Sequence, residues 1–85
     1  MNITADLFEL AQDRLLARSG VPRSVRQKLG LSLAEVAASV GTTRSSVQRW
    51  ETGQTVPRSA AGLRYVAEIK RLRRLAAGIS DEATA

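Results

Sequence analysis

The fold of this protein is decided by residues 29–53, which read LGLSLAEVAASVGTTRSSVQRWETG. Ser32 and Glu35 have the spacing of a capping box, in which a hydroxyl and a carboxylate satisfy backbone amides in the first turn of a helix. Gly41 suits the left-handed residue that ends such a helix, and the threonine pair after it can cap another one. The stretch therefore predicts two short helices that meet at a tight glycine turn.

The apolar residues of this stretch lie where two packed helices need them. Val40 and Val47 can meet beneath the turn, and Ala37 is small where the helices cross. Trp50 points inward from the end of the second helix. The outer side of that helix carries polar and basic residues, namely Arg44, Ser45, Gln48 and Arg49. This arrangement is a helix-turn-helix pattern.

Caps and helix breakers on either side of the motif indicate three further helices. We expect a first helix from Thr4 to about Ser19, a second from Pro22 to about Leu29, and a long last helix from Ser59 to about Gly78. No stretch alternates apolar and polar residues between hairpin turns, so no strand is predicted. The expected fold is all-α, with a single domain at 1–85, a helix-turn-helix core at 22–67 and a disordered tail at 80–85.

The composition excludes several classes of function. The 85 residues include no histidine and no cysteine, so the commonest general base, the commonest metal ligand and all thiolate chemistry are missing. We therefore expect no enzyme, no metal and no cofactor. No apolar run is long enough to span a membrane and the first residues lack a secretory pattern, so the expected location is the cytoplasm.

The basic charge is concentrated in the middle and the C-terminal part of the chain. Thirteen basic residues, eleven of them arginine, face eight acidic ones, which gives a net charge of +5. Residues 1–21 sum to −1, whereas residues 22–58 and 59–80 each sum to +4. This asymmetry suits an anionic partner, and an arginine bias favours phosphates and guanine edges. Charge alone fits a solvated helix face equally well.

A longer stretch resembles a known family. Residues 25–63, VRQKLGLSLAEVAASVGTTRSSVQRWETGQTVPRSAAGL, are similar to the Cro/cI-type (XRE) helix-turn-helix domain of phage repressors and many bacterial regulators. The LGLS start, the glycine turn, the Trp-Glu-x-Gly end and the Pro-Arg pair beyond it all agree with the family pattern. The resemblance implies a five-helix, lambda-repressor-like helix-turn-helix domain, here with an extra N-terminal helix and a long C-terminal helix, in the bacterial cytoplasm or nucleoid.

The resemblance also implies which residues contact DNA. Its recognition helix falls on residues 43–52, in the major groove, with base-reading positions at Arg44, Ser45 and Arg49. Ser46 matches a contact position beside the backbone, and Gln54 and Thr55 fall where the loop of the family meets phosphates. Arg58 matches an arginine near the minor groove. With Gln48, which shares the outer face, the predicted DNA-binding residues are Thr43, Arg44, Ser45, Ser46, Gln48, Arg49, Gln54, Thr55 and Arg58.

For several residues a structural interpretation competes with a functional one. The arginines of the recognition helix could be solvated surface residues, although an exposed basic recognition helix favours DNA contact. Trp50 could stack on a base, but its inward phase favours the core. The resemblance implies that Arg26 and Glu51 form a partly buried ion pair. Leu33 stands where many family members have a phosphate-binding glutamine, so backbone amides at that helix start would supply the contact.

The last helix carries an apolar stripe at heptad-like spacing. It consists of Tyr65, Ile69, Leu72, Ala76 and Ile79. The stripe either packs on the N-terminal helix of the same chain or forms a dimer contact. Leu63 and Val66 point elsewhere and are expected to seal the helix-turn-helix core.

These observations predict a sequence-specific regulator that binds double-stranded DNA, most simply a phage Cro-like or immunity repressor. It would cover a two-fold operator as a homodimer. Two alternatives remain open. One is an antitoxin whose extra helices hold a toxin protein while the motif binds its own promoter. The other is a protein-interaction adaptor that has kept the fold without binding DNA.

Overall fold

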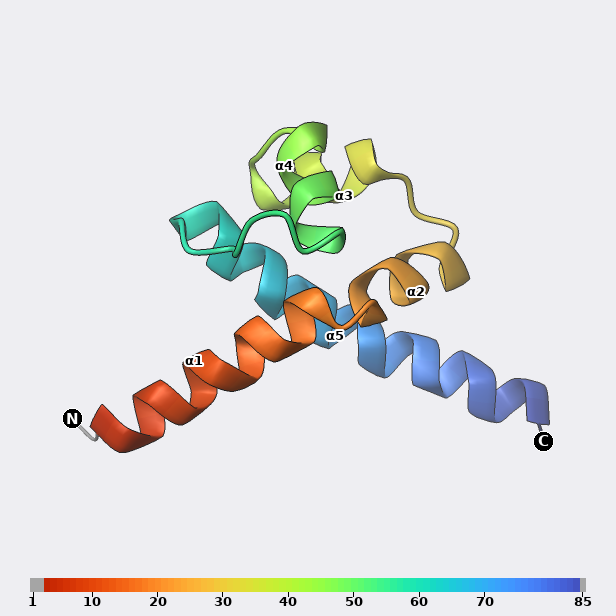
Figure 1. Cartoon of the computed structure of the whole chain (residues 1–85). Helices are drawn as coiled ribbons and strands as arrows, with labels where there is room; N and C mark the ends of the chain where they lie inside the picture. Colours follow the sequence, from red (N-terminus) through yellow and green to blue (C-terminus); the bar gives the residue numbers. More distant parts are fainter. Residues whose placement is uncertain (1–2, 85) are drawn as a thin grey trace.

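A computed structural model describes residues 3–84, whose backbone forms five α-helices and no strand (Figure 1). The expected all-α fold class is therefore confirmed. The helices are α1 (Ile3–Arg18), α2 (Val21–Lys28), α3 (Leu33–Val40), α4 (Arg44–Glu51) and α5 (Ala60–Thr84). Among these residues, no helix combines the length and apolar character that crossing a membrane requires.

The two central helices begin and end at the residues that the local signals predict. The Ser32 hydroxyl accepts a hydrogen bond from the Glu35 amide at 3.0 Å, and the Glu35 carboxylate accepts one from the Ser32 amide at 2.8 Å. Gly41 ends α3 with φ of 77°. Thr43 rather than its neighbour caps α4, because its hydroxyl accepts from the Ser46 amide at 3.1 Å.

The outer helices differ from the prediction at their ends. The first helix begins at Ile3, so Thr4 lies inside it instead of capping it. The last helix continues six residues beyond Gly78, to Thr84, although a tail was expected at 80–85. An interior glycine costs a helix only about 1 kcal/mol, and no proline follows it to force an end. Residues 1, 2 and 85 lie outside the described part.

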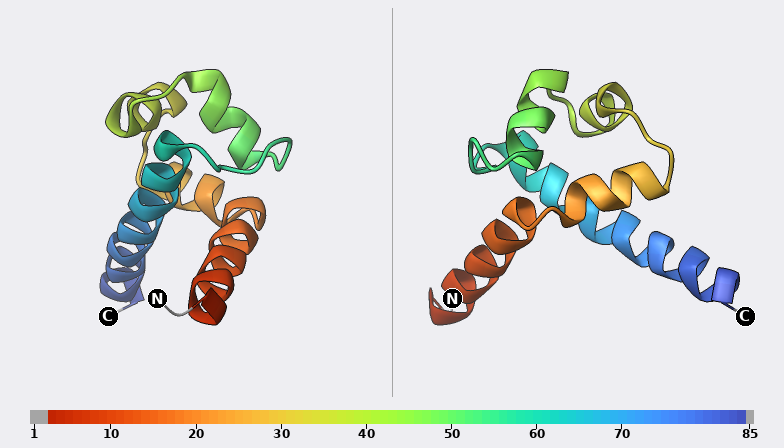
Figure 2. Two further views of the ribbon diagram at one scale, coloured as in Figure 1. Left: turned by 90° about the vertical axis from the view of Figure 1, so that its left-hand side faces the viewer. Right: turned by 45° about the vertical axis from the view of Figure 1, so that its right-hand side comes forward.

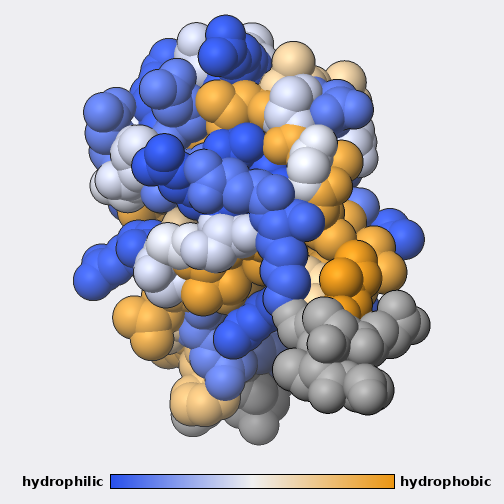
Figure 3. Space-filling view, turned by 90° about the vertical axis from the view of Figure 1, so that its right-hand side faces the viewer, coloured by the Kyte–Doolittle hydropathy of each residue, from blue (hydrophilic) through white to orange (hydrophobic). Residues whose placement is uncertain are grey.

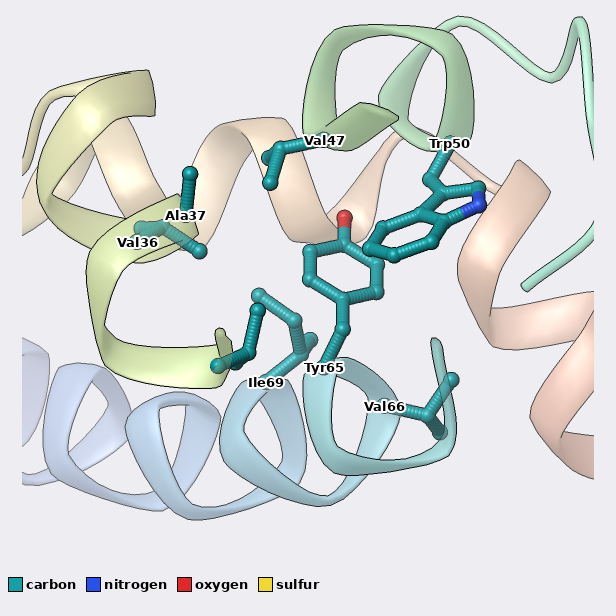
Figure 4. Packing of buried hydrophobic residues seen from close by; sticks show 8 residues of the cluster. Val36, Ala37, Val47, Trp50, Tyr65, Val66 and Ile69 are labelled. Carbon is teal, nitrogen blue, oxygen red and sulfur yellow. The ribbon is translucent and has the colours of Figure 1, made fainter. Parts of the chain in front are cut away.

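The core lies where α5 crosses beneath the helix-turn-helix motif (Figure 4). Trp50 of α4 packs on Tyr65 of α5, with ring centroids 5.0 Å apart and planes tilted by 37°, so Trp50 belongs to the core. The buried cluster consists of Val36, Ala37, Val40, Val47, Trp50, Tyr65, Val66 and Ile69.

The apolar stripe of the last helix does not form one separate seam. Tyr65 and Ile69 belong to the core of the helix-turn-helix motif itself, and Ala76 is also buried. Leu72 is half-buried and Ile79 is exposed, so the stripe leaves the core towards its C-terminal end. Leu63, which was expected to seal the core, is exposed. The reason is the direction in which α5 crosses the motif, because that direction selects the face of α5 that is covered.

The N-terminal part of α1 and the C-terminal part of α5 extend from the side of the molecule that lies away from α4 (Figures 1 and 2). The last turns of α1 pack on the body through Ala17, which is buried, and Leu16, which contacts the core cluster. An ion pair between Asp13 and Lys70 connects α1 to α5. Beyond this point the two helices diverge.

Candidate nucleic-acid interface

The outward face of α4 presents the side chains expected to read DNA. Val47 and Trp50 point into the core, and because a helix turns by 100° per residue this orients the remaining positions towards solvent. The exposed residues of α4 include Arg44, Ser45, Gln48 and Arg49. Packing on one side of an eight-residue helix therefore presents two guanidinium groups, one hydroxyl and one amide on the other side.

The cap of α4 uses two of the predicted contact residues. The Thr43 hydroxyl accepts from the Ser46 amide and donates to the Ser46 hydroxyl at 3.0 Å. Thr43 is exposed and Ser46 is half-buried. The two hydroxyls are thus engaged with each other at the helix start, and their first role is to orient α4. Of the two hydroxyl protons, only that of Ser46 is not used by this cap and could be donated to a phosphate.

The loop after α4 is held close to the end of that helix. The Thr52 hydroxyl donates to the backbone carbonyls of Gln48 and Arg49 at 3.0 and 3.3 Å. The backbone amide of Gln54 donates to the Arg49 carbonyl at 2.9 Å. Gln54 and Thr55 are exposed beside the C-terminal end of α4. The structure therefore brings these two loop residues next to the recognition helix.

Arg58 follows a loop that is seated tightly on α5. Pro57 is buried, and a Cβ atom placed on Gly62 would lie 2.9 Å from three of its atoms. Only glycine permits this approach. Arg58 itself is exposed. The sequence-based predictions did not include Gly62, although a glycine inside a predicted helix is a signal that another backbone segment comes close there.

Arg26 and Glu51 form a bidentate ion pair that holds the end of α4. The Arg26 Nε and Nη2 atoms donate to the two carboxylate oxygens at 2.6 and 3.1 Å, and Nη1 donates to the Leu31 carbonyl at 3.0 Å. The two side chains are only 13% and 4% exposed. The hydrogen bond to Glu51 raises the pKa of Arg26 above its ordinary value. One guanidinium thus joins α2, the segment before α3 and the recognition helix.

Tyr65 lies beneath the recognition helix with its hydroxyl directed towards α4 (Figure 4). The side chain is fully buried, and its hydroxyl has no hydrogen-bond partner among the described residues. Burial raises the pKa of Tyr65, and the negative charge of Glu51 raises it further. The hydroxyl therefore stays protonated. The sequence placed Tyr65 on an apolar stripe but gave no indication of a polar atom left without a partner.

Two further side chains support the motif. The sequence did not indicate a role for Arg64, and it marked Leu33 only as the replacement of a phosphate-binding glutamine. Arg64 of α5 donates from Nε to the Val40 carbonyl at 3.0 Å and so stabilises the end of α3 at the turn. Leu33 is half-buried and packs against the core cluster. At the start of α3, the capping box already occupies the amides of Ser32 and Glu35. An anion there would have to use the remaining first-turn amides.

No described side chain neutralises the positive charge of this face. Arg44, Arg49 and Arg58 form no ion pair with any residue of 7–79, the range whose side chains the structure describes. Exposed cations that lack acidic neighbours on a rigid surface attract an anionic partner. The charge and shape of this face suit the phosphate backbone and the base edges of DNA.

Comparison with known proteins agrees with this geometry. Residues 23–61 match the family model described as Helix-turn-helix, which covers most of α2, all of α3 and α4, and the start of α5. No curated protein matches the chain, and no solved structure matches it. Residues 23–61 thus form a helix-turn-helix domain of the Cro/cI-type (XRE) family. It therefore carries the domain of a DNA-binding regulator.

Proposed function

We propose that this protein is a transcriptional repressor that recognises a specific operator in double-stranded DNA and acts by occupying it. The observation that carries the proposal is the exposed, unneutralised basic face of α4 on a motif whose other side is packed into the core. A recognition helix must be held rigidly if its side chains are to distinguish bases. The Arg26–Glu51 pair provides that support at its C-terminal end.

The exposed residues divide into two roles under this proposal. Arg49 and Arg44 are five residues apart, so they point about 140° from each other around the helix axis and reach different base steps. Ser45 and Gln48 lie on the same exposed side. Gln54 and Thr55 contact phosphates, and Arg58 approaches the minor groove, where the electrostatic potential attracts a cation.

A homodimer on the operator completes the mechanism. A helix-turn-helix dimer places its two recognition helices in successive major grooves about 34 Å apart. Occupancy of such a site in the cytoplasm would block RNA polymerase without any cofactor. Control would then depend on the amount of protein.

The exposed apolar residues outside the core support one alternative. In an antitoxin, the extra helices would hold a toxin protein while α4 binds the promoter of the operon. A gene for a toxin next to the coding sequence would favour this reading. The adaptor alternative is less well supported, because an adaptor has no need of the exposed Arg44 and Arg49.

Selection of bound sequences from random duplex DNA tests the proposal. The expected result is a two-fold consensus, bound at least roughly 10³-fold more tightly than a scrambled duplex at physiological salt. Binding curves on the selected and scrambled duplexes should be recorded at two salt concentrations, because phosphate contacts are strongly salt-dependent. Equal affinity for both duplexes would refute sequence-specific regulation.

A further inference from the structure

The C-terminal part of α1 is seated against the end of α4 and the loop between α4 and α5 (residues 52–59). The two segments share one narrow crevice, which is lined by Arg14, Ala17, Arg18, Trp50, Gly53, Thr55, Val56 and Pro57. Its volume of about 10 Å³ leaves room for no more than about one water molecule. A Cβ atom placed on Gly53 would lie 3.9 Å from the Cβ atom of Arg18, an ordinary van der Waals contact. α1 therefore has a fixed position beside this loop.

This part of α1 carries two exposed arginines. Arg14 and Arg18 are four residues apart, so their side chains leave the helix only about 40° from each other. Ala17 is buried and anchors the helix on the body, whereas both arginines face solvent. The C-terminal end of α1 lies beside the loop, and its N-terminal end points away from the motif (Figures 1 and 2). The packing of Ala17 thus places both arginines next to the loop.

No described side chain neutralises these two arginines. Arg14 and Arg18 form no ion pair with any residue of 7–79. Of the described acidic side chains of α1, Asp13 pairs with Lys70 of α5, and Glu9 leaves the helix about 140° away from Arg14. Like charges four residues apart on a helix repel each other by about 0.2–0.5 kcal/mol. An anion beside the pair would remove this repulsion.

The helix dipole accounts for only one of the two arginines. Arg18 is the last residue of α1, and a cation in the last turn of a helix gains about 0.3–1 kcal/mol from the dipole. Arg14 lies one turn earlier, where this effect has fallen off. A single explanation for both residues therefore requires an anionic partner.

Thr55 connects the two arginines to the predicted DNA-binding surface. It is exposed, it lines the same crevice as Arg14 and Arg18, and in the proposed function it contacts a phosphate. Duplex DNA carries one negative charge per about 1.7 Å of its axis, so a backbone that reaches this loop brings further phosphates close to the arginines. In Figure 3, hydrophilic side chains dominate the upper left, on the side of α4, and apolar ones gather lower down. The N-terminal turns of α1, where Leu7 and Phe8 are exposed, are less suited to phosphates.

We propose that Arg14 and Arg18 bind the phosphate backbone of duplex DNA, next to the phosphates that the loop contacts. The contact does not depend on base sequence, so it raises the affinity for every duplex and steepens the salt dependence. It makes α1, which lies outside the matched residues 23–61, a part of the DNA-binding surface. The inference deepens the proposed function, and it rests on that function for the position of Thr55 at the backbone.

Binding of the full chain to the selected operator and to a scrambled duplex, at several salt concentrations, tests the proposal. Each phosphate contact contributes about 0.9 to the slope of log K against log salt concentration. Arg14→Gln/Arg18→Gln should therefore lower this slope by roughly 2 per bound chain on both duplexes and weaken binding at least roughly tenfold. Arg14→Lys/Arg18→Lys keeps both charges and should keep most of the slope.

The charge-matched control is Arg71→Gln/Arg73→Gln. Both residues are exposed and lie where α5 extends away from α4 (Figure 1), so this pair removes the same net charge without removing a contact and should keep the wild-type slope. Circular dichroism should show that both double variants are folded, since all four side chains are exposed. An unchanged slope in Arg14→Gln/Arg18→Gln, or an equal reduction in the control, would overturn the proposal.

Ethylation of single phosphates in the operator locates the contact, because it removes the charge of one phosphate at a time. It should weaken binding of the wild type at one or more phosphates where Arg14→Gln/Arg18→Gln is not affected. These phosphates should neighbour those at which Thr55→Ala loses its sensitivity. If ethylation affected the wild type and the α1 variant equally at every position, the arginines would not contact the backbone.

The use of two duplexes separates this inference from the proposed function. A wild type without preference for the operator would refute the repressor, while a lower slope of the α1 variant on the scrambled duplex would still support the contact. A wild type that prefers the operator, with an unchanged slope in the α1 variant, would refute the contact and leave the repressor in place.

Discussion

Removal of the Glu51 carboxylate should destabilise the whole motif. Arg26 is only 13% exposed and gives two of its hydrogen bonds to Glu51. In Glu51→Gln the guanidinium keeps its charge and its bond to the Leu31 carbonyl but loses the anion that compensates its burial. Breaking one side of a buried pair costs several kcal/mol, and the remaining exposure and hydrogen bonds reduce this to about 2–4 kcal/mol.

That magnitude is large for a domain of this size. One kcal/mol lowers Tm by about 4–8 °C in small domains, so Glu51→Gln should melt roughly 8–32 °C below the wild type. Circular dichroism during heating and urea titration measures both quantities. The matched control is Glu68→Gln, which breaks a surface pair with the mostly exposed Arg71 and should cost no more than about 1 kcal/mol.

The double variant Arg26→Met/Glu51→Met makes the test sharper. Replacing both charges by apolar side chains removes the uncompensated ion, so stability should return to within about 1–2 kcal/mol of the wild type or exceed it. The reasoning would be refuted if Glu51→Gln and Glu68→Gln had the same small effect. It would also be refuted if the double variant were less stable than Glu51→Gln.

Three further predictions concern separate parts of the molecule. Arg49→Ala should weaken binding to the selected operator by about 1–3 kcal/mol and relax the preference at one or two base pairs. The control variant Arg74→Ala should affect specific and scrambled duplexes alike. An equal loss on both duplexes for Arg49→Ala would exclude base reading by this residue. Tyr65→Phe removes a buried hydroxyl without a partner, so urea titration should show unchanged or higher stability, contrary to the loss expected if the hydroxyl were bonded. The hydrogen bond that the Ser32 backbone amide donates to the carboxylate, together with the Ser32 side chain, lowers the pKa of Glu35 from its ordinary 4.5. The resulting stability is complete above that value and is lost as the pH falls through the lowered pKa. Glu35→Gln should therefore flatten the dependence of Tm on pH in this acid range, and an unchanged slope would argue against the contribution.

Local signals in the sequence were sufficient to predict the helix-turn-helix motif. The hydroxyl of Ser32, the carboxylate of Glu35 and the cap at Thr43 act within a single helical turn, so their effect does not depend on distant residues. The inward phase of Val47 and Trp50 follows from helical geometry alone. The exposed set on α4 follows in turn, since it is the part of the helix that is left over.

Contacts between residues far apart in the sequence were decided only by the tertiary structure. Arg64 reaches the Val40 carbonyl and Pro57 lies against Gly62 because α5 crosses the motif in one particular direction. The same crossing buries Tyr65 and leaves its hydroxyl without a partner. Helical periodicity identifies positions that share a face, but it does not state what that face meets.

The first and last helices show the same division most clearly. The sequence identified an apolar stripe on the last helix and predicted that it packs on the N-terminal helix or forms a dimer contact. The structure places Ala76 inside and Leu15 and Leu75 outside, which periodicity cannot distinguish. Burial depends on which surfaces approach each other in three dimensions, and the hydrophobic effect acts wherever water is removed, whether by the same chain or by a second copy.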